Sequence, residues 1–236
     1  MTQITHNLMN IQGRIVAASE RYERTPGSVR LLAVSKRHPA SSVIEAFGSG
    51  QTQFGENFVT ESVNKQAEVN QLFESDPNKI NQLSWHFIGR IQSNKTRQVA
   101  QHFSWVHSLD RIKIARRLND HRQGQPLNVL VQVNLSENPD RPGVEPNQVE
   151  AFLNELETFE HLALRGLMAM APATDCFETQ SSAFSEVKQL FDQFGAGRDG
   201  FTELSMGMSG DLEAAIANGS TWVRIGTDVF GKRPSD

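Results

Sequence analysis

The stretch Leu31-Leu32-Ala33-Val34-Ser35-Lys36-Arg37-His38-Pro39 decides the fold. Residues 31–34 are apolar without alternation, which is typical of a strand in a parallel sheet that is covered on both faces. Pro39 ends the strand and is favoured in the first turn of a following helix. Because side chains alternate along a strand, Lys36 shares a face with Val34. The stretch therefore predicts a buried parallel strand with a lysine at its carboxyl end.

Lys36 has two interpretations. Most lysines are solvated surface charges, and many strands end in one. If the shared face is instead the inside of a barrel, loss of solvent favours the neutral amine over the ammonium ion. The neutral amine is the nucleophile that forms a Schiff base with an aldehyde. Which of these two interpretations of Lys36 holds depends on the other residues at the same rim.

The composition excludes several classes of protein. The chain has 236 residues, of which 38% are hydrophobic, and a formal net charge of −4. Such mild acidity argues against nucleic acid as a partner, because nucleic-acid binding requires a basic face. Cys176 is the only cysteine, which excludes an internal disulfide and a thiolate metal site. We expect no bound metal.

The sequence contains no targeting signal that we recognise. Residues 1–6 lack a charged region followed by an apolar one, so they do not resemble a secretion signal. No run of residues is long and apolar enough to cross a membrane. We therefore expect a cytoplasmic protein with no membrane partner.

Strand-like and helix-like segments alternate along the whole chain, with one extra helix over about residues 5–23. The strand-like segments are residues 31–34, 53–54, 84–89, 103–109, 128–134, 164–170, 202–206 and 222–226. This pattern predicts a (β/α)8 barrel, and since no linker interrupts it we expect a single domain over residues 1–236. The alternative is an open doubly wound sheet, which is expected to carry a glycine fingerprint that residues 35–38 lack.

Two connecting segments are less regular. The segment before Asp76 is predicted to be a polar helix with Val63, Ala67 and Leu72 on one side, the side expected to be apolar. The loop over residues 136–143 is rich in proline and charge. It is either a lid or simply a loop.

The loops after the seventh and eighth strands carry candidate anion ligands, and phosphate often binds there in such barrels. Ser209 suits the N-cap of a helix over residues 211–218, where a hydroxyl and free N–H groups can hold an anion. Gly226 permits close approach of the backbone, and Thr227 adds another hydroxyl. Each of these residues is also common in ordinary caps and turns. Together with Lys36 on the same rim, they indicate a phosphorylated aldehyde ligand.

Two further polar residues are predicted to point into the barrel. Arg224 alternates with Val223 and Ile225, and a buried guanidinium needs a partner. That partner is either an inward carboxylate or the pyridine nitrogen of pyridoxal phosphate, which arginine would leave unprotonated. For His86 we expect a buried, hydrogen-bonded histidine rather than a proton-transfer residue.

Six motifs in order resemble the pyridoxal phosphate homeostasis proteins (the YggS/PROSC type). The motifs are residues 32–36, 54–57, 85–89 with Gln92, Asn94 and Lys95, 166–168, 204–209 with Asp211, and 223–227. The resemblance covers nearly the whole chain. It implies a fold-type III barrel like the N-terminal domain of alanine racemase.

The resemblance also implies a cofactor and its ligands. The cofactor is pyridoxal 5'-phosphate (PLP), held by a Schiff base on Lys36. The implied contacts are Ser209, Gly226 and Thr227 at the phosphate, Arg224 at the pyridine nitrogen, and Asn57, His86, Ser205 and Met206 along the cofactor. The chain departs from the family at Arg37-His38, where Thr-Lys is more usual, and in residues 138–143, which lack a lysine before the glycine. Both departures concern lid contacts.

By the same resemblance, the expected function is to carry or buffer PLP in intracellular vitamin B6 homeostasis. We expect a monomer without robust catalysis, with PLP-requiring apo-enzymes as candidate partners. The alternative is a PLP-dependent amino-acid racemase, which needs a proton base on each face of the substrate. Lys36 could serve one face and His86 is an untested candidate for the other. The only tyrosine, Tyr22, lies on the first helix, and the chain ends at Asp236 without the β-domain of alanine racemase.

Two other enzyme classes fit less well. A Schiff-base aldolase would use the barrel and Lys36, but it has no use for Arg224 at a ring nitrogen. A serine hydrolase is disfavoured because residues 207–211 lack the final glycine of a nucleophile elbow.

Overall fold

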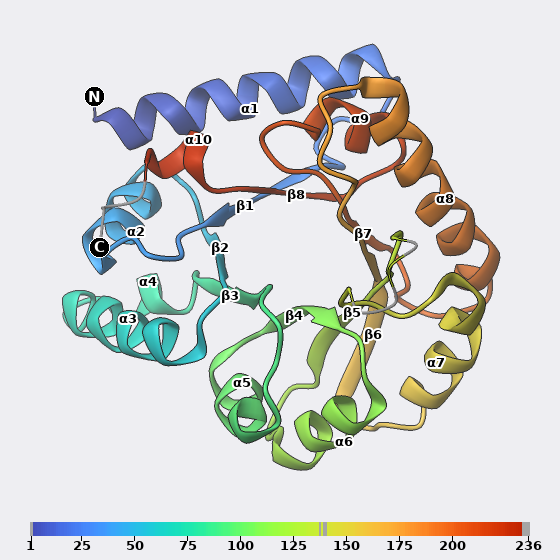
Figure 1. Cartoon of the computed structure of the whole chain (residues 1–236). Helices are drawn as coiled ribbons and strands as arrows, with labels where there is room; N and C mark the ends of the chain where they lie inside the picture. Colours follow the sequence, from blue (N-terminus) through green and yellow to red (C-terminus); the bar gives the residue numbers. More distant parts are fainter. Residues whose placement is uncertain (1, 137, 139–140, 233–236) are drawn as a thin grey trace.

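Eight parallel strands form a closed barrel in which each strand pairs with the next and β8 pairs with β1 (Figure 1). The computed structural model describes residues 2–136, 138 and 141–232. The strands are β1 (Arg30–Val34), β2 (Gln53–Glu56), β3 (Ser84–Phe87), β4 (Trp105–Leu109), β5 (Leu127–Gln132), β6 (Leu162–Met168), β7 (Glu203–Ser205) and β8 (Trp222–Ile225). The predicted (β/α)8 barrel is confirmed, and the open doubly wound sheet is excluded.

Helices surround the barrel. They are α1 (Gln3–Arg21), α2 (Ala40–Gly48), α3 (Val59–Leu72), α4 (Pro77–Ile80), α5 (Thr96–His102), α6 (Ile112–His121), α7 (Val149–Leu156), α8 (Phe177–Gly195), α9 (Leu212–Ala217) and α10 (Thr227–Phe230), with 3-10 turns η1 (Ser93–Lys95) and η2 (Pro146–Gln148). The extra N-terminal helix, α1, lies across α9, α10 and α2 (Figure 1). Among the described residues, no helix is at once long enough and apolar enough to span a bilayer.

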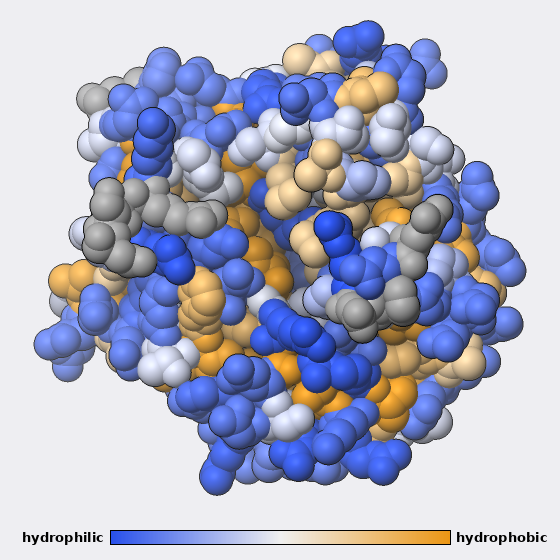
Figure 2. Space-filling model, viewed as in Figure 1, coloured by the Kyte–Doolittle hydropathy of each residue, from blue (hydrophilic) through white to orange (hydrophobic). Residues whose placement is uncertain are grey.

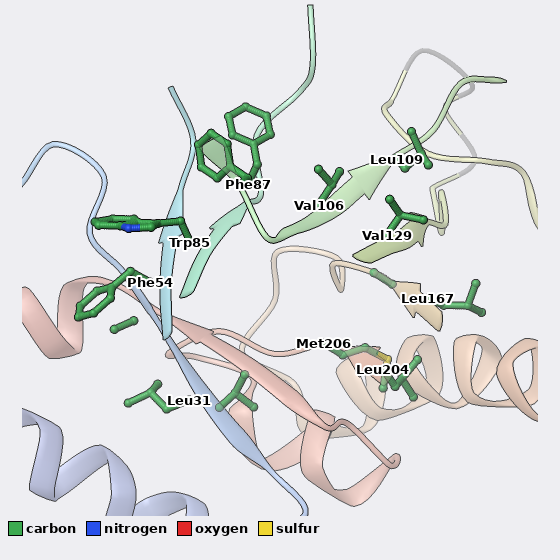
Figure 3. Packing of buried hydrophobic residues seen from close by; sticks show 14 of the residues in the cluster. Leu31, Phe54, Trp85, Phe87, Val106, Leu109, Val129, Leu167, Leu204 and Met206 are labelled. Carbon is green, nitrogen blue, oxygen red and sulfur yellow. The ribbon is translucent and has the colours of Figure 1, made fainter. Parts of the chain in front are cut away.

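The main core lies between the barrel and its helices. Outward-facing strand residues such as Leu31, Val129 and Leu204 are buried there against the helices (Figure 3). Burying each such side chain contributes about 1.5–3 kcal/mol. The alternate strand positions face the barrel interior. Leu32 and Trp222 are fully buried there and do not belong to the core between the barrel and its helices.

The predicted packing side of α3 is wrong. Ala67 and Leu72 are exposed and Val63 is only half-buried, whereas Ser62 and Lys65 are buried. The reason is electrostatic, because α3 packs where the barrel presents the buried carboxylate of Glu56. The helix turns a lysine toward this charge and leaves an apolar side chain in solvent.

Candidate functional site

A cavity of about 490 Å³ opens at the carboxyl ends of the strands. Figure 2 shows this face of the molecule, hollowed near its middle between hydrophilic and hydrophobic side chains. Six of the nine residues that the sequence predicts for the site border the cavity. They are Lys36, Asn57, Ser209, Arg224, Gly226 and Thr227.

Lys36 lies two residues beyond β1, in a turn rather than on the strand, and its side chain is half-buried. Both neighbours of Lys36 are held by carboxylates. The hydroxyl of Ser35 donates to Oε1 of Glu56 at 2.6 Å, and the backbone N–H of Arg37 donates to Oε1 of Glu61 at 2.5 Å. Arg37 itself has a φ of 63°, in the left-handed region. The turn that presents Lys36 is therefore fixed on both sides.

Sequence reasoning missed the pair of buried charges behind this turn. Nζ of Lys65 lies 2.7 Å from Oε1 of Glu56 and also donates to the carbonyl oxygen of Ser35 at 2.7 Å. Burial raises the pKa of Glu56 above its ordinary value, and the attraction of Lys65 only partly offsets this. The sequence offered one signal for this pair. Glu56 and Asn57 follow an apolar strand, and Lys65 comes nine residues after Glu56.

Arg224 enters the cavity from β8, the strand that pairs with β1. Its Nη1 donates to the carbonyl oxygen and to the hydroxyl of Ser205, both at 2.7 Å, and its Nη2 donates to the carbonyl of Ala169 at 2.9 Å. These bonds use three of the five N–H groups of the guanidinium. Burial lowers the pKa of Arg224 to about 10, and Asp211 partly opposes this shift. Arg224 remains a cation at neutral pH.

Ser209 does not cap a helix, so this part of the sequence prediction is wrong. The helix α9 begins at Leu212 with Asp211 at its N-cap position, and Ser209 lies in the preceding turn. The reason is that the carboxylate of Asp211 accepts the backbone N–H of Met208, which closes a turn over Ser209. Ser209 still borders the cavity.

Gly226 and Thr227 border the same cavity after β8, the strand that pairs with β7. Gly226 is the N-cap of α10, and a Cβ atom added to it would lie 3.2 Å from the carbonyl oxygen of Val34. A side chain at this position would therefore crowd the neighbouring strand. Thr227, the first residue of α10, is exposed.

The structure does not bring the other three predicted residues to the cavity wall. Alternation along β7 turns Ser205 into the barrel, beneath Arg224, and the next residue, Met206, packs in the apolar layer outside the barrel (Figure 3). His86 is fully buried in the barrel interior. Burial lowers the pKa of His86 to about 3. It is a neutral, hydrogen-bonded histidine, as its strand position indicated.

The cavity also borders residues that the sequence did not single out. His38, Gln132 and Met168 line it, and Met170 and Met208 are partly exposed at its edge. The loop over residues 136–143, expected to be a lid or a simple loop, contributes Pro142. Residues 137, 139 and 140 of that loop lie outside the described residues.

Comparison with known proteins gives the family. The family model for the alanine racemase N-terminal domain matches residues 3–234. The pyridoxal phosphate homeostasis protein of Haemophilus influenzae is 47% identical over 234 residues, which cover 98% of this chain and 96% of that protein. The protein of the same name from Pseudomonas aeruginosa is 46% identical over 235 residues, 99% of this chain and 97% of that one. The chain belongs to the pyridoxal phosphate homeostasis protein family.

Solved structures agree with this family and with its fold. PipY from Synechococcus elongatus, solved with and without PLP, is 35% identical, with a TM-score of 0.82 and coverage of 97% of this chain and all of PipY. Alanine racemase from Clostridium difficile is only 15% identical, with a TM-score of 0.67, and the match covers 94% of this chain and 56% of the racemase. The likeness to the racemase shows the shared barrel alone. The predicted resemblance to the pyridoxal phosphate homeostasis protein family is confirmed.

Proposed function

We propose that the chain binds PLP in this cavity through a Schiff base on Lys36, and that it carries or buffers the cofactor for intracellular vitamin B6 homeostasis. One observation carries the proposal. Lys36 and Arg224 border the same cavity from neighbouring strands, because Leu32 of β1 is paired in register with Arg224 of β8. One rim therefore carries both an amine that can react with an aldehyde and a cation that can donate a hydrogen bond to a ring nitrogen.

The cavity fits this cofactor in size and in chemistry. Its volume of about 490 Å³ is in the range of small-molecule pockets. Val34, Ile88 and Met168 give it apolar surface for an aromatic ring. Ser209, Gly226 and Thr227 offer hydroxyl and backbone groups for a phosphate.

Each polar residue has a defined part in this proposal. Lys36 would hold the aldehyde of the cofactor through a C=N bond, which its neutral Nζ amine can form with loss of one water. Two N–H groups of Arg224 have no acceptor on the described protein residues, so one of them would be available to the pyridine nitrogen. Because arginine keeps its protons, the ring nitrogen stays unprotonated. When bound, the cofactor supplies an electron sink that this contact weakens.

The structure favours a carrier over a racemase. Racemisation needs a second proton base across the substrate from Lys36. The only tyrosine, Tyr22, does not border the cavity and stacks on Phe177 with ring centroids 6.4 Å apart. His86 is sealed in the barrel interior with a pKa of about 3. Neither residue is placed to serve as that base.

The cellular setting is a further proposal. The relatives are named for PLP homeostasis, and we propose that this chain is a cytoplasmic monomer that passes PLP to PLP-requiring apo-enzymes. Light scattering after gel filtration measures the oligomeric state, and a monomer is expected to have a mass near 26.3 kDa. A dimer mass would contradict it.

A transfer assay tests the function. The chain is loaded with PLP, desalted and mixed with a PLP-requiring apo-enzyme, whose recovery of activity is followed. We expect transfer from the wild-type chain, and Lys36→Ala should emerge from desalting without cofactor, while Lys113→Ala, a change of an exposed lysine, should behave as wild type. Racemase turnover that is lost in Lys36→Ala but retained in Tyr22→Phe would contradict the carrier function.

A further inference from the structure

We propose that Ser205, His107 and His86 are positioning residues, which hold Arg224 through a hydrogen-bond chain of one fixed direction inside the barrel. The inference rests on the proposed function, because it concerns how the residue assigned to the ring nitrogen is kept in place. None of the three residues borders the cavity, so none is proposed to touch the cofactor.

The chain of contacts is continuous from the cavity floor into the barrel. Nη1 of Arg224 lies 2.7 Å from Oγ of Ser205, and that Oγ lies 2.9 Å from Nδ1 of His107. Nε2 of His107 lies 2.9 Å from Nδ1 of His86. Nε2 of His86 lies 2.9 Å from Oε1 of Gln53. In addition to β8, the strands β7, β4, β3 and β2 contribute to these contacts. The hydrogen-bond chain therefore crosses the barrel and does not follow one strand.

The Arg224 end of the chain fixes its direction. Arginine has donors only, so Oγ of Ser205 accepts from Arg224 and its own hydrogen goes to Nδ1 of His107. His107 must then carry its proton on Nε2 and donate it to Nδ1 of His86. At the other end Nε2 of His86 faces two oxygens that can accept its proton, Oε1 of Gln53 at 2.9 Å and Oγ of Ser84 at 3.2 Å.

The reverse direction leaves a group unsatisfied. If His107 donated from Nδ1, Oγ of Ser205 would accept both contacts and its own hydrogen would have no acceptor. Ser205, His107 and His86 are all fully buried, and a buried donor without a partner is costly. The geometry therefore assigns the neutral Nε2–H form to both histidines.

The chain holds Arg224 and does not conduct protons to the cavity. A proton relay would end on the guanidinium, which does not give up its proton at neutral pH. A proton added to Nδ1 of His86 would face the Nε2–H group of His107, and one added to Nδ1 of His107 would face the O–H group of Ser205, so either proton would set two donors against each other. Burial and the cations Arg224 and Arg30 oppose that charge as well. With both hydrogens of Nη1 on Ser205, the guanidinium plane is fixed, and its remaining N–H groups keep one orientation.

Nitrogen NMR of the apoprotein tests the direction of the chain. Long-range ¹H–¹⁵N correlation spectra of the imidazole rings distinguish the two neutral forms of histidine. We expect His86 and His107 to be neutral Nε2–H rings at pH 7. A proton on Nδ1 of either ring, or a charged ring, would overturn the inference. This measurement needs no cofactor, so it stands even if PLP binding fails.

Binding of two ligands tests the positioning role. PLP is compared with its 1-deaza analogue, in which C–H replaces the ring nitrogen, in wild type and in Ser205→Ala. Ser62→Ala is the control, since Ser62 is equally buried and its hydroxyl accepts from the side-chain amide of Gln66, which is not part of this hydrogen-bond chain. We expect Ser205→Ala to lower the preference of the chain for PLP over the analogue by about threefold to tenfold, the worth of one hydrogen bond. An equal loss for both ligands would indicate a merely structural effect and would contradict the proposal.

The two failures are distinguishable. If wild type binds both ligands equally, Arg224 makes no contact to the ring nitrogen, and the positioning role and that part of the proposed function fail together. If wild type prefers PLP and Ser205→Ala keeps the full preference, only the positioning role fails.

Discussion

Nζ of Lys65 lies 2.7 Å from Oε1 of Glu56 in the interior, where the two side chains are only 5% and 0% exposed. The same Nζ donates to the carbonyl of Ser35, and Glu56 accepts the hydroxyl of that residue. The pair thereby ties α3 to the turn that presents Lys36. Among the described residues Oε2 of Glu56 finds no hydrogen-bond partner, so Lys65 is the main compensation for a buried charge.

Removing one partner of this pair should destabilise the protein strongly. We expect Lys65→Met to lower the free energy of unfolding by about 3–5 kcal/mol, because the carboxylate of Glu56 stays buried without its cation. Urea denaturation measures the change. The control is Lys79→Met, which breaks an exposed pair with Asp76 and should cost less than about 1 kcal/mol.

The double variant Glu56→Gln/Lys65→Met keeps this prediction testable if the single variant folds poorly. It removes both charges, so it should recover part of the lost stability. A double variant less stable than Lys65→Met would contradict an electrostatic origin.

Replacing Arg224 by lysine should weaken PLP binding although the charge is kept. A lysine cannot hold Ser205 and Ala169 and also direct an N–H to the ring nitrogen. Loss of a hydrogen bond from a charged group predicts roughly a tenfold or greater rise in Kd, measured by absorbance titration. The control is Arg122→Lys, because Arg122 also donates to backbone carbonyls but does not border the cavity. An unchanged Kd in Arg224→Lys would contradict the ring-nitrogen contact.

The buried histidines should make stability depend on pH. Burial lowers the pKa of His86 to about 3, and the unfolded chain takes up the proton near pH 6.5. Between these values the unfolded state binds more protons, so the contribution of His86 is complete above pH 6.5 and is lost as the pH falls. The stability of wild type relative to His86→Gln should fall by about 1.4 kcal/mol per pH unit between pH 6 and pH 4. Urea denaturation at each pH gives the free energy of unfolding of both proteins. If wild type and His86→Gln depend on pH in the same way, a buried neutral His86 is contradicted.

Gly166 should not tolerate a side chain. It lies in β6 with a φ of 152°, beside a shift in the β5–β6 register, and an added Cβ would overlap the carbonyl oxygen of Glu203. We expect Gly166→Ala to cost more than about 3 kcal/mol in the free energy of unfolding, or to abolish soluble expression. Gly48→Ala is the control, because nothing lies within 4 Å of its added Cβ, and it should be nearly neutral. Equal stability of the two variants would contradict the close approach.

The fold was predictable because each strand and helix carries its own pattern. Apolar strands such as residues 31–34 must be buried on both faces. A chain of eight strand–helix units has few folds that bury all its strands in this way. The inward position of Arg224 followed from simple alternation along β8. Six of the nine predicted site residues meet at one cavity for the same reason, since the carboxyl ends of all strands lie on one rim.

The remaining features depend on contacts between distant segments. Lys65 faces inward only because Glu56 lies opposite, so hydrophobic periodicity assigns the wrong side of α3. Asp211 rather than Ser209 takes the N-cap position, since a turn closed by Met208 competes with the helix. His107 looked like one more polar residue in a strand, and only the closed barrel brings it to His86 and Ser205.

The central claim is that Lys36 carries the cofactor, and borohydride mapping tests it most directly. The purified chain is mixed with PLP, reduced with borohydride, digested and examined by mass spectrometry. We predict one pyridoxyl group per chain, on the peptide that contains Lys36, and no label on that peptide in Lys36→Ala. A label that maps mainly to another lysine, or labelling that is unchanged in Lys36→Ala, would contradict the account.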